Sequence, residues 1–277
     1  MRVDAHQHFW RVSRGDYDWM SPELYPSLCR DYLPDDLAPL LAAGRIDRTV
    51  VIQAAETVAE TEFMLGLAEV TPFIGAVVGW VDFASAEAPA IIERLAREPR
   101  LAGLRPMLQD LPDPDWILRP DVQPAIRATE ANGLRFDALI KPPQLPAIRR
   151  LLEAYPDLPV VIDHGAKPQI AERKIDDWAD HIRAIARDSR AVCKLSGIAT
   201  EAEPGWTLDS MRPYVEVLLE SFGPSRLMFA SDWPVMTLNT DYVAWLAATE
   251  ALTGHLTAAE QADIYGGTAA RFYGLEA

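Results

Sequence analysis

Short apolar runs alternate along this chain with longer amphipathic stretches rich in Ala, Leu, Glu and Arg. Several of the short runs are apolar at every position, as in Val50-Val51-Ile52 and Val160-Val161-Ile162. Continuous apolar runs of this length are typical of strands buried on both faces, as in a parallel sheet. The pattern predicts eight strands, at residues 2–6, 49–53, 73–81, 101–107, 136–141, 159–164, 191–196 and 226–231.

The amphipathic stretches predict helices at residues 34–43, 57–70, 87–97, 120–132, 145–155, 170–187, 208–222, 242–253 and 258–272. Thr57 with Glu60 three residues later is a capping-box pattern, and Gly44 is a typical helix-stop residue. Each predicted strand is followed by at least one helix, which is the pattern of a (β/α)8 barrel. We therefore expect an α/β protein, a TIM barrel that forms one domain over residues 1–277. A doubly wound open sheet is the alternative, and the lack of a Gly-rich phosphate turn after the first strand disfavours it.

Composition excludes several classes of partner. The chain has 277 residues, of which 49% are hydrophobic and 24% charged, and its formal net charge is −15. An acidic chain without a run of Lys and Arg has no electrostatic footprint for nucleic acid. No apolar run reaches the roughly 18–20 residues needed to cross a bilayer, and no signal-peptide pattern precedes the first strand. Cys29 and Cys193 form no C-x-x-C pair, so we expect reduced thiols in a cytoplasmic protein.

One connection is longer than the barrel pattern requires. Residues 9–33 are irregular and carry five aromatic residues, Trp10, Tyr17, Trp19, Tyr25 and Tyr32. Long loops in compact domains are often functional, and this one would emerge beside the end of the first strand. It could cover the site as a lid, or its aromatic side chains could simply pack on the rim of the barrel.

Polar or aromatic residues stand at the carboxyl end of every predicted strand, where TIM barrels build their active sites. In chain order they are His6 and His8, Gln53, Trp80 and Asp82, Arg105, Lys141, Asp163 and His164, Lys194 and Ser196, and Ser231, Asp232 and Trp233. A purely structural barrel is not expected to collect such a set at one end. The sequence therefore predicts an active site there.

Three histidines and one aspartate form the centre of this prediction. His6 and His8 are two residues apart, so on a strand their side chains point to the same face, and Asp4 is expected to point with them. With His164 and Asp232 they offer three imidazoles and one carboxylate, which suits one divalent metal, most of all zinc. Without a metal, the imidazoles could polarise a carbonyl oxygen and Asp232 could deprotonate water.

The other residues at the strand ends suggest substrate contacts. Arg105, Lys141 and Lys194 bring positive charge that could hold ring oxygens or a developing carboxylate, although buried acids could pair with them instead. Trp80 and Trp233 could stack on a sugar ring or pack on the rim. Gln53 is a candidate hydrogen-bonding residue.

Four strand-end segments resemble the amidohydrolase superfamily, and within it the group that hydrolyses lactones. They are His6-Gln7-His8, the Asp-His-Gly-Ala-Lys-Pro run at 163–168, Cys193-Lys194-Leu195-Ser196-Gly197 and Ser231-Asp232-Trp233-Pro234. The resemblance implies a distorted (β/α)8 barrel that opens a sugar-acid lactone of the L-fuconolactone type to its hydroxy acid. It also implies that Asp232 is the general base, and that His6, His8 and His164 bind a metal or hold the carbonyl oxygen. The metal is dispensable in some members of the group.

This chain departs from the superfamily pattern at two strands. Most amidohydrolases place a Lys or Glu on the fourth strand to bridge two metals, whereas this chain has Arg105-Pro106 there, which indicates one metal at most. Lys141-Pro142-Pro143 differs from the fifth-strand end of fuconolactonase-like members, so the particular lactone stays open.

Two other functions remain as alternatives. A metal-dependent decarboxylase of the same superfamily shares the histidine and aspartate set, and a barrel kept only for binding is a third reading. The sequence has no G-x-S-x-G segment for a nucleophilic serine and no nucleotide-binding fingerprint. Hydrolysis by activated water is the chemistry that the residues support best, and the oligomeric state stays open.

Overall fold

The computed structural model describes residues 1–276, which contain an eight-stranded parallel sheet with the strands in sequence order. The strands are β1 (Val3–Gln7), β2 (Arg48–Ile52), β3 (Ile74–Gly79), β4 (Leu101–Leu104), β5 (Arg135–Ala138), β6 (Val160–Ile162), β7 (Val192–Leu195) and β8 (Leu227–Phe229). All seven neighbouring pairs are parallel. The predicted strands are confirmed. β1 and β2 have the predicted length of five residues, and the other six strands are shorter than the predicted ranges.

Backbone hydrogen bonds between the first and last strand segments bring the two edges of the sheet together. Gln7 forms a parallel bridge with Trp233. The Asp232 amide donates to the His6 carbonyl at 2.8 Å, and the His8 amide donates to the Trp233 carbonyl at 2.7 Å. These bonds lie beyond the last regular residue of β8, at the carboxyl end of the strands. The sheet is therefore a nearly closed barrel, and the expected TIM-barrel fold is confirmed.

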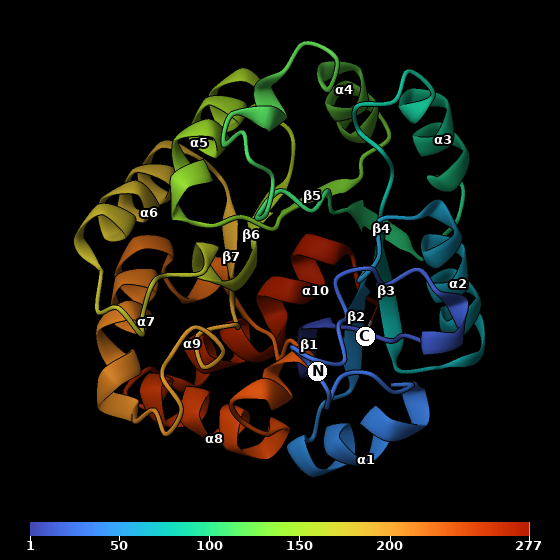
Figure 1. The fold of residues 1–277 in the computed structure, drawn as a ribbon. Coiled ribbons are helices and arrows are strands. Elements are labelled where there is room, and N and C mark those ends of the chain that lie inside the picture. Colours follow the sequence, from blue (N-terminus) through green and yellow to red (C-terminus); the bar gives the residue numbers. More distant parts are fainter. Residues whose placement is uncertain (277) are drawn as a thin grey trace.

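Helices surround the strands (Figure 1). They are α1 (Pro34–Gly44), α2 (Val58–Val70), α3 (Ala88–Leu95), α4 (Gln123–Ala131), α5 (Leu145–Ala154), α6 (Asp176–Asp188), α7 (Leu208–Phe222), α8 (Tyr242–Thr253), α9 (Ala258–Ala262) and α10 (Thr268–Tyr273). Short 3-10 turns lie at Val12–Arg14, Trp116–Leu118, Pro142–Gln144, Asp163–Ala166, Pro224–Arg226 and Val235–Leu238. None of the helices within residues 1–276 has the length and apolar character required to span a membrane.

Most predicted helices agree with the structure to within three residues at each end, and two differ more. The helix expected from residue 170 begins at Asp176. The helix expected at 258–272 is divided by a π-helical turn, Asp263–Gly267. At Gly266 in this turn, a Cβ atom would lie only 2.1 Å from the carbonyl oxygen of Met1. The turn therefore allows the C-terminal segment to approach the start of β1 closely.

The strand interiors are buried on two sides, which explains their continuous apolar runs. Val50 and Ile52 belong to an apolar cluster that also contains Val78 and Met228 from other strands. Val51, between them, belongs to the larger cluster that the strands form with the surrounding helices. Because strand side chains alternate, a strand in a barrel needs apolar residues at every position.

A β-bulge in β1 changes the direction of its side chains. Asp4 is in register with Thr49 and Gln7 with Val51, so β1 has one residue more than β2 over this stretch. Asp4 accepts hydrogen bonds from the Ser231 amide at 2.8 Å and from the Tyr242 hydroxyl of α8 at 3.0 Å. It therefore faces α8 and not the site. The expectation that Asp4 points with His6 is wrong, because the extra residue breaks the alternation.

The C-terminal helix α10 lies inside the ring of outer helices in Figure 1, where it is drawn in red. It contacts β1 and β8. Ala269 and Tyr273 of α10 belong to the same apolar cluster as the inward-facing strand residues. The helix thus covers the interior of the barrel, and its Tyr273 hydroxyl reaches Asp137 on β5 at 2.7 Å.

Candidate active site

His6, His8, His164 and Asp232 converge at the carboxyl end of the strands. His6 lies in β1 and His8 just beyond it, His164 lies in the turn after β6, and Asp232 follows β8. Each of the four is at most 4% exposed. The predicted convergence of four residues from three parts of the chain is therefore present in the structure.

The side-chain atoms of the cluster approach one another closely. Asp232 Oδ1 lies 3.2 Å from His8 Nε2, 3.6 Å from His6 Nε2 and 3.8 Å from His164 Nε2. His6 Nε2 and His8 Nε2 are 3.2 Å apart. Asp232 Oδ1 is thus the atom that all three imidazoles share.

Unusual backbone conformations place two members of the cluster. His164 has φ 54° and Asp232 has φ 62°, both in the left-handed region that residues other than glycine seldom adopt. Gly197, after β7, has φ 68°, and a Cβ atom there would lie 2.6 Å from the Cβ of His164. The absence of a side chain at Gly197 leaves room for His164. Strain of this kind is typical of functional sites.

The hydrogen bonds of His8 assign its tautomer. Its Nδ1 lies 2.8 Å from the Ile52 carbonyl oxygen, which can only accept, so Nδ1 carries a proton and donates. Burial is the main cause that lowers the pKa of His8 below its ordinary value, so the ring is neutral at pH 7. Its Nε2 then presents a lone pair toward Asp232 Oδ1.

The other charges of the cluster follow from burial and from neighbours. Burial lowers the pKa of His164 to about 4 and that of His6 well below its ordinary value, and Lys194 lowers the pKa of His6 further. Burial alone would raise the pKa of Asp232, but interactions with His164, His8 and His6 outweigh it and hold the pKa below its ordinary value. Asp232 is therefore a carboxylate at neutral pH, surrounded by neutral imidazoles.

The cluster fits one divalent metal. His6, His8 and Asp232 can each direct one ligand atom to a common point, and a second group of this kind is formed by His6, Asp163 and His164. Ligand atoms about 2.0–2.2 Å from a tetrahedral zinc are about 3.3–3.6 Å apart, which agrees with the separations above. The His8 lone pair and the Asp232 carboxylate would repel each other unless a cation or a proton lies between them. Three protein ligands, such as His6, His8 and Asp232, and an open fourth position are typical of a catalytic zinc site.

Arg105 and Gln53 lie beside the cluster and bind each other. Arg105 Nη1 is 3.2 Å from His6 Nε2, and Arg105 also donates through Nη2 to the Gln53 carbonyl. The Gln53 side chain donates to the Arg105 carbonyl at 2.8 Å. Both residues are buried. A fixed guanidinium therefore stands next to His6, directly after β4.

The remaining predicted contact residues occupy different surroundings. Lys141 is exposed and forms an ion pair with Asp110 at 2.7 Å, while Trp80 is partly buried. Trp233 is buried, with its ring packed edge-on against Tyr32 at a centroid distance of 5.2 Å. Lys194 is fully buried, and its charge is paired within the protein. Of these residues, the structure places only Lys141 and Trp80 where a side chain is open to solvent.

The match to a family model decides the family. The amidohydrolase model matches residues 3–275. The chain belongs to the amidohydrolase family. It is 45% identical to the L-fucono-1,5-lactonase of Burkholderia ambifaria over 99% of this chain and 96% of that protein.

Solved structures agree with this family. An amidohydrolase from Burkholderia multivorans with bound zinc is 36% identical over the whole of both chains, with a TM-score of 0.93. The 5-carboxyvanillate decarboxylase of Sphingomonas paucimobilis covers 99% of each chain but is only 17% identical, with a TM-score of 0.67. That second likeness shows the fold alone. The decarboxylase alternative is thus supported only distantly.

Within this amidohydrolase site, Lys167 and Glu201 were missed by the sequence reasoning. Lys167 Nζ lies 3.9 Å from Glu201 Oε1, and neither side chain is more than a third exposed. The pKa of Glu201 is raised mainly by burial and further by the nearby Asp232. Lys167 stands three residues after His164, within the Asp-His-Gly-Ala-Lys-Pro run at 163–168, and this was the available signal. Glu201 lies in an irregular loop after β7, where no periodicity marks it.

The aromatic residues of the 9–33 segment pack on the rim of the barrel. Trp10 is fully buried, with its ring edge-on to Tyr32 at 5.3 Å and to Trp19 at 5.7 Å. The Trp19 indole donates to the Ala54 carbonyl at 2.6 Å, just beyond β2. This packing agrees with the second of the two expectations for the segment. A movement of the segment as a lid stays a prediction.

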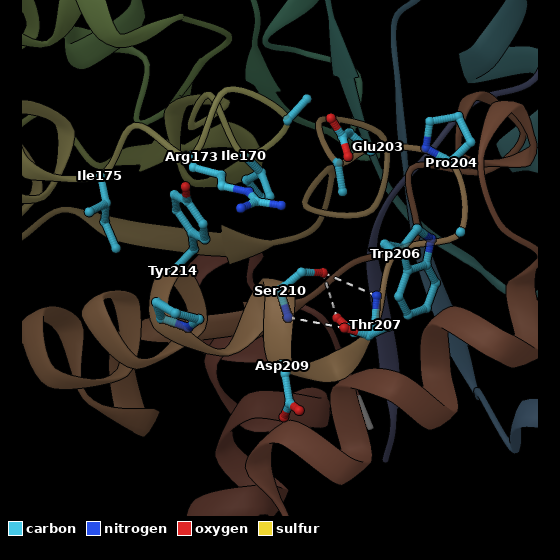
Figure 2. A pocket seen from close by; sticks show the side chains of 14 residues that line it. Ile170, Arg173, Ile175, Glu203, Pro204, Trp206, Thr207, Asp209, Ser210 and Tyr214 are labelled. Carbon is cyan, nitrogen blue, oxygen red and sulfur yellow. Dashed lines mark hydrogen bonds between the residues drawn. The ribbon is translucent and has the colours of Figure 1, made fainter.

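A hollow of about 540 Å³ lies between the segments that follow β6 and β7. Figure 2 shows Arg173 and Tyr214 at one end of it and Trp206 and Pro204 at the other. None of the four cluster residues lines it. The hollow is therefore separate from the cluster of histidines and Asp232 that forms the candidate active site.

Proposed function

We propose that this protein hydrolyses a sugar-acid lactone, of the L-fucono-1,5-lactone type, to the open hydroxy acid. The observation that carries the proposal is the meeting of His6, His8 and His164 on one oxygen of Asp232. The 45% identity to an L-fucono-1,5-lactonase over nearly the full length of both chains supports the substrate class.

In the proposed reaction, Asp232 acts first as a base. Its carboxylate is ionised at neutral pH, because its pKa lies below its ordinary value. It orients a water molecule and takes a proton from it as the water oxygen bonds to the lactone carbonyl carbon. The carbonyl oxygen gains the negative charge of the tetrahedral intermediate, so it needs a donor or a cation beside it.

The intermediate then opens the ring. The bond from the carbonyl carbon to the ring oxygen breaks, and protonated Asp232 returns its proton to that alkoxide. Water and lactone are thereby converted to one hydroxy acid with no other reactant. A divalent metal, when bound, supplies Lewis acidity that polarises a carbonyl and makes water more acidic. His6, His8 and Asp232 are the residues that would hold it, with His164 directed at the same oxygen.

Substrate contacts follow as part of the same proposal. Arg105 is the nearest fixed cation to the cluster, since its Nη1 lies 3.2 Å from His6 Nε2. The Gln53 Oε1 atom is buried without a hydrogen-bond partner among the described residues, so it is free to accept from a sugar hydroxyl. In this proposal Lys141 and Trp80 contact the sugar part of the substrate, and Trp233 forms part of the wall of the site.

We infer a cytoplasmic setting from the two cysteines, Cys29 and Cys193, which are both free. We also infer that residues 1–277 act as one amidohydrolase-type domain with a small-molecule substrate.

The test is acid release from L-fucono-1,5-lactone, followed with a pH indicator, for protein as purified, chelated and loaded with zinc. Asp232→Asn should lower kcat by about 10²–10⁴-fold while the protein stays folded. Asp209→Asn removes the same charge from a fully exposed side chain and should leave kcat unchanged. Wild-type turnover by Asp232→Asn would sink the proposal, as would release of carbon dioxide without ring opening from a panel of lactones and aromatic acids.

A further inference from the structure

A chain of buried polar side chains connects the C-terminal helix to His6. The Tyr273 hydroxyl of α10 donates to Asp137 Oδ2 at 2.7 Å, and Lys194 Nζ donates to the same oxygen at 2.5 Å. Lys194 Nζ also lies 2.9 Å from Asp163 Oδ1 and 3.3 Å from His6 Nδ1. Asp137, Asp163, Lys194 and His6 are all 0% exposed. We call Tyr273, Asp137, Lys194 and Asp163 the floor network.

The floor network joins four elements that are distant in sequence. Asp137 is on β5, Asp163 follows β6, Lys194 is on β7 and Tyr273 is on α10. Lys194 Nζ also lies 5.5 Å from the centre of the Tyr273 ring. The ammonium is fully buried and is paired with two carboxylates, those of Asp137 and Asp163. Lys194 is therefore placed to hold other side chains in position.

The network approaches His6 from the side opposite to the cluster. His6 Nε2 faces His8 and Asp232, whereas its Nδ1 faces Lys194 at 3.3 Å and Asp163 Oδ1 at 3.6 Å. Partners on the far nitrogen fix the plane of an imidazole ring that acts through the other nitrogen. Lys194 in turn determines where the Asp163 carboxylate can lie, because it bonds that carboxylate and Asp137 at once.

We propose that Lys194, held by Asp137 and Tyr273, is a positioning residue that aligns His6 and Asp163 for metal binding and for lactone hydrolysis. The catalytic part of this inference rests on the proposed function. The metal-binding part rests on the His6, His8 and Asp232 geometry alone. The C-terminal helix then belongs to the active-site architecture, although none of its residues reaches the cluster.

The main test is the charge-neutral double variant Lys194→Met/Asp137→Asn. Lys194→Met alone would leave the buried Asp137 without its cation and Asp163 with only the Arg105 guanidinium, 3.5 Å from its Oδ2, and is expected to unfold the protein. Removing one positive and one negative charge together avoids this, and it also keeps the net charge near His6 constant. Tyr273→Phe is the milder variant, because it removes only the hydroxyl at the end of the network.

Tyr265→Phe is the matched control. Tyr265 is also buried in the C-terminal segment, and its hydroxyl bonds Thr253 at 3.0 Å, outside the floor network. Zinc affinity is measured by competition of the chelated protein with a chromophoric chelator, and kcat and KM are measured separately on zinc-loaded protein. A role limited to folding would lower the thermal midpoint without changing zinc affinity in the folded protein.

We expect the double variant to bind zinc about 10–100-fold more weakly than wild type. Its kcat should fall at unchanged KM. Tyr273→Phe should weaken zinc binding by at least threefold, while Tyr265→Phe stays within twofold of wild type. Zinc affinity and kcat within twofold of wild type in a folded double variant would overturn the inference. If the double variant does not fold, equal zinc affinities in Tyr273→Phe and Tyr265→Phe would overturn it.

These results can be separated from the proposed function. Weaker zinc binding in a protein whose wild type opens no lactone would leave the positioning role intact and reject the lactonase assignment. Unchanged zinc binding in the folded double variant, with a wild type that opens lactones, would reject the positioning role and leave the lactonase assignment intact.

Discussion

Adding one methyl group at Gly197 should displace His164, one of the proposed catalytic residues, without removing any polar group. Gly197 follows β7 and packs against the side chain of His164. In Gly197→Ala, the new Cβ would lie 2.6 Å from the Cβ and 2.8 Å from the Cγ of His164. Both distances are below any that real Cβ atoms show. His164 cannot easily turn away, because its own backbone is in the left-handed region and Ser196 Oγ holds its Nδ1 at 2.8 Å.

The structure gives the size of the effect on the rate and of the effect on stability. To restore an ordinary contact of 3.4 Å, His164 must move by about 0.8 Å. A misplacement of about 1 Å in a catalytic group can cost about 100-fold in rate, so we expect kcat to fall by about 30–100-fold. The backbone at φ 68° adds a cost of about 1–2 kcal/mol for alanine in the free energy of unfolding.

Gly133→Ala separates the two effects. Gly133 lies between α4 and β5 at φ 67°, and a Cβ there would meet nothing within 4 Å. Chemical unfolding of both variants should show the backbone loss of about 1–2 kcal/mol, with a further loss from the clash in Gly197→Ala, whereas only Gly197→Ala should lose lactonase activity. If Gly197→Ala keeps kcat within twofold of wild type, or if Gly133→Ala loses as much activity, the steric reasoning is refuted.

Three further predictions concern stability, the support of His164 and the metal. Burial raises the pKa of Glu60 to about 7 from 4.5, so the folded state retains a proton that the unfolded chain releases over this range. The free energy of unfolding should therefore fall by about 3 kcal/mol between pH 4.5 and pH 8, and unfolding of Glu60→Gln should lack this component. Ser196→Ala removes the 2.8 Å partner of His164 Nδ1 and should lower kcat about tenfold, and an unchanged kcat would contradict a supporting role. Saturating zinc should raise the thermal midpoint of wild type by more than it raises that of His8→Ala. Equal zinc-induced rises in the two proteins would exclude His8 as a ligand.

Local patterns were sufficient to predict the barrel but not its exact element boundaries. The continuous apolar run Val50-Val51-Ile52 predicted a strand buried on both faces, and the structure places Val50 and Val51 in different apolar clusters. The break at Gly266 could not be predicted, because it arises from a close approach to Met1, 265 positions earlier in the chain. Contacts of this kind leave no periodic signal in the residues around them.

For the candidate site too, some features could be predicted from local patterns and others could not. His6, His8, His164 and Asp232 could be located because barrel topology alone brings all strand ends together. The direction of Asp4 was predicted wrongly, since one extra residue in β1 reverses the alternation on which the prediction depended.

Lys194 illustrates a second limit of the sequence. A lysine at a strand end suggests a substrate contact, and the sequence offers no measure of how deep the residue lies. The acid that contacts Lys194 most closely, Asp137, stands 57 residues away inside an apolar strand, and its hydroxyl partner Tyr273 lies on the last helix. A buried cation requires such partners, because an unpaired charge in the interior is strongly destabilising. A charged residue at an inward position of one strand therefore predicts an opposite charge on another, and Asp137 with Lys194 is the pair that satisfies this rule here.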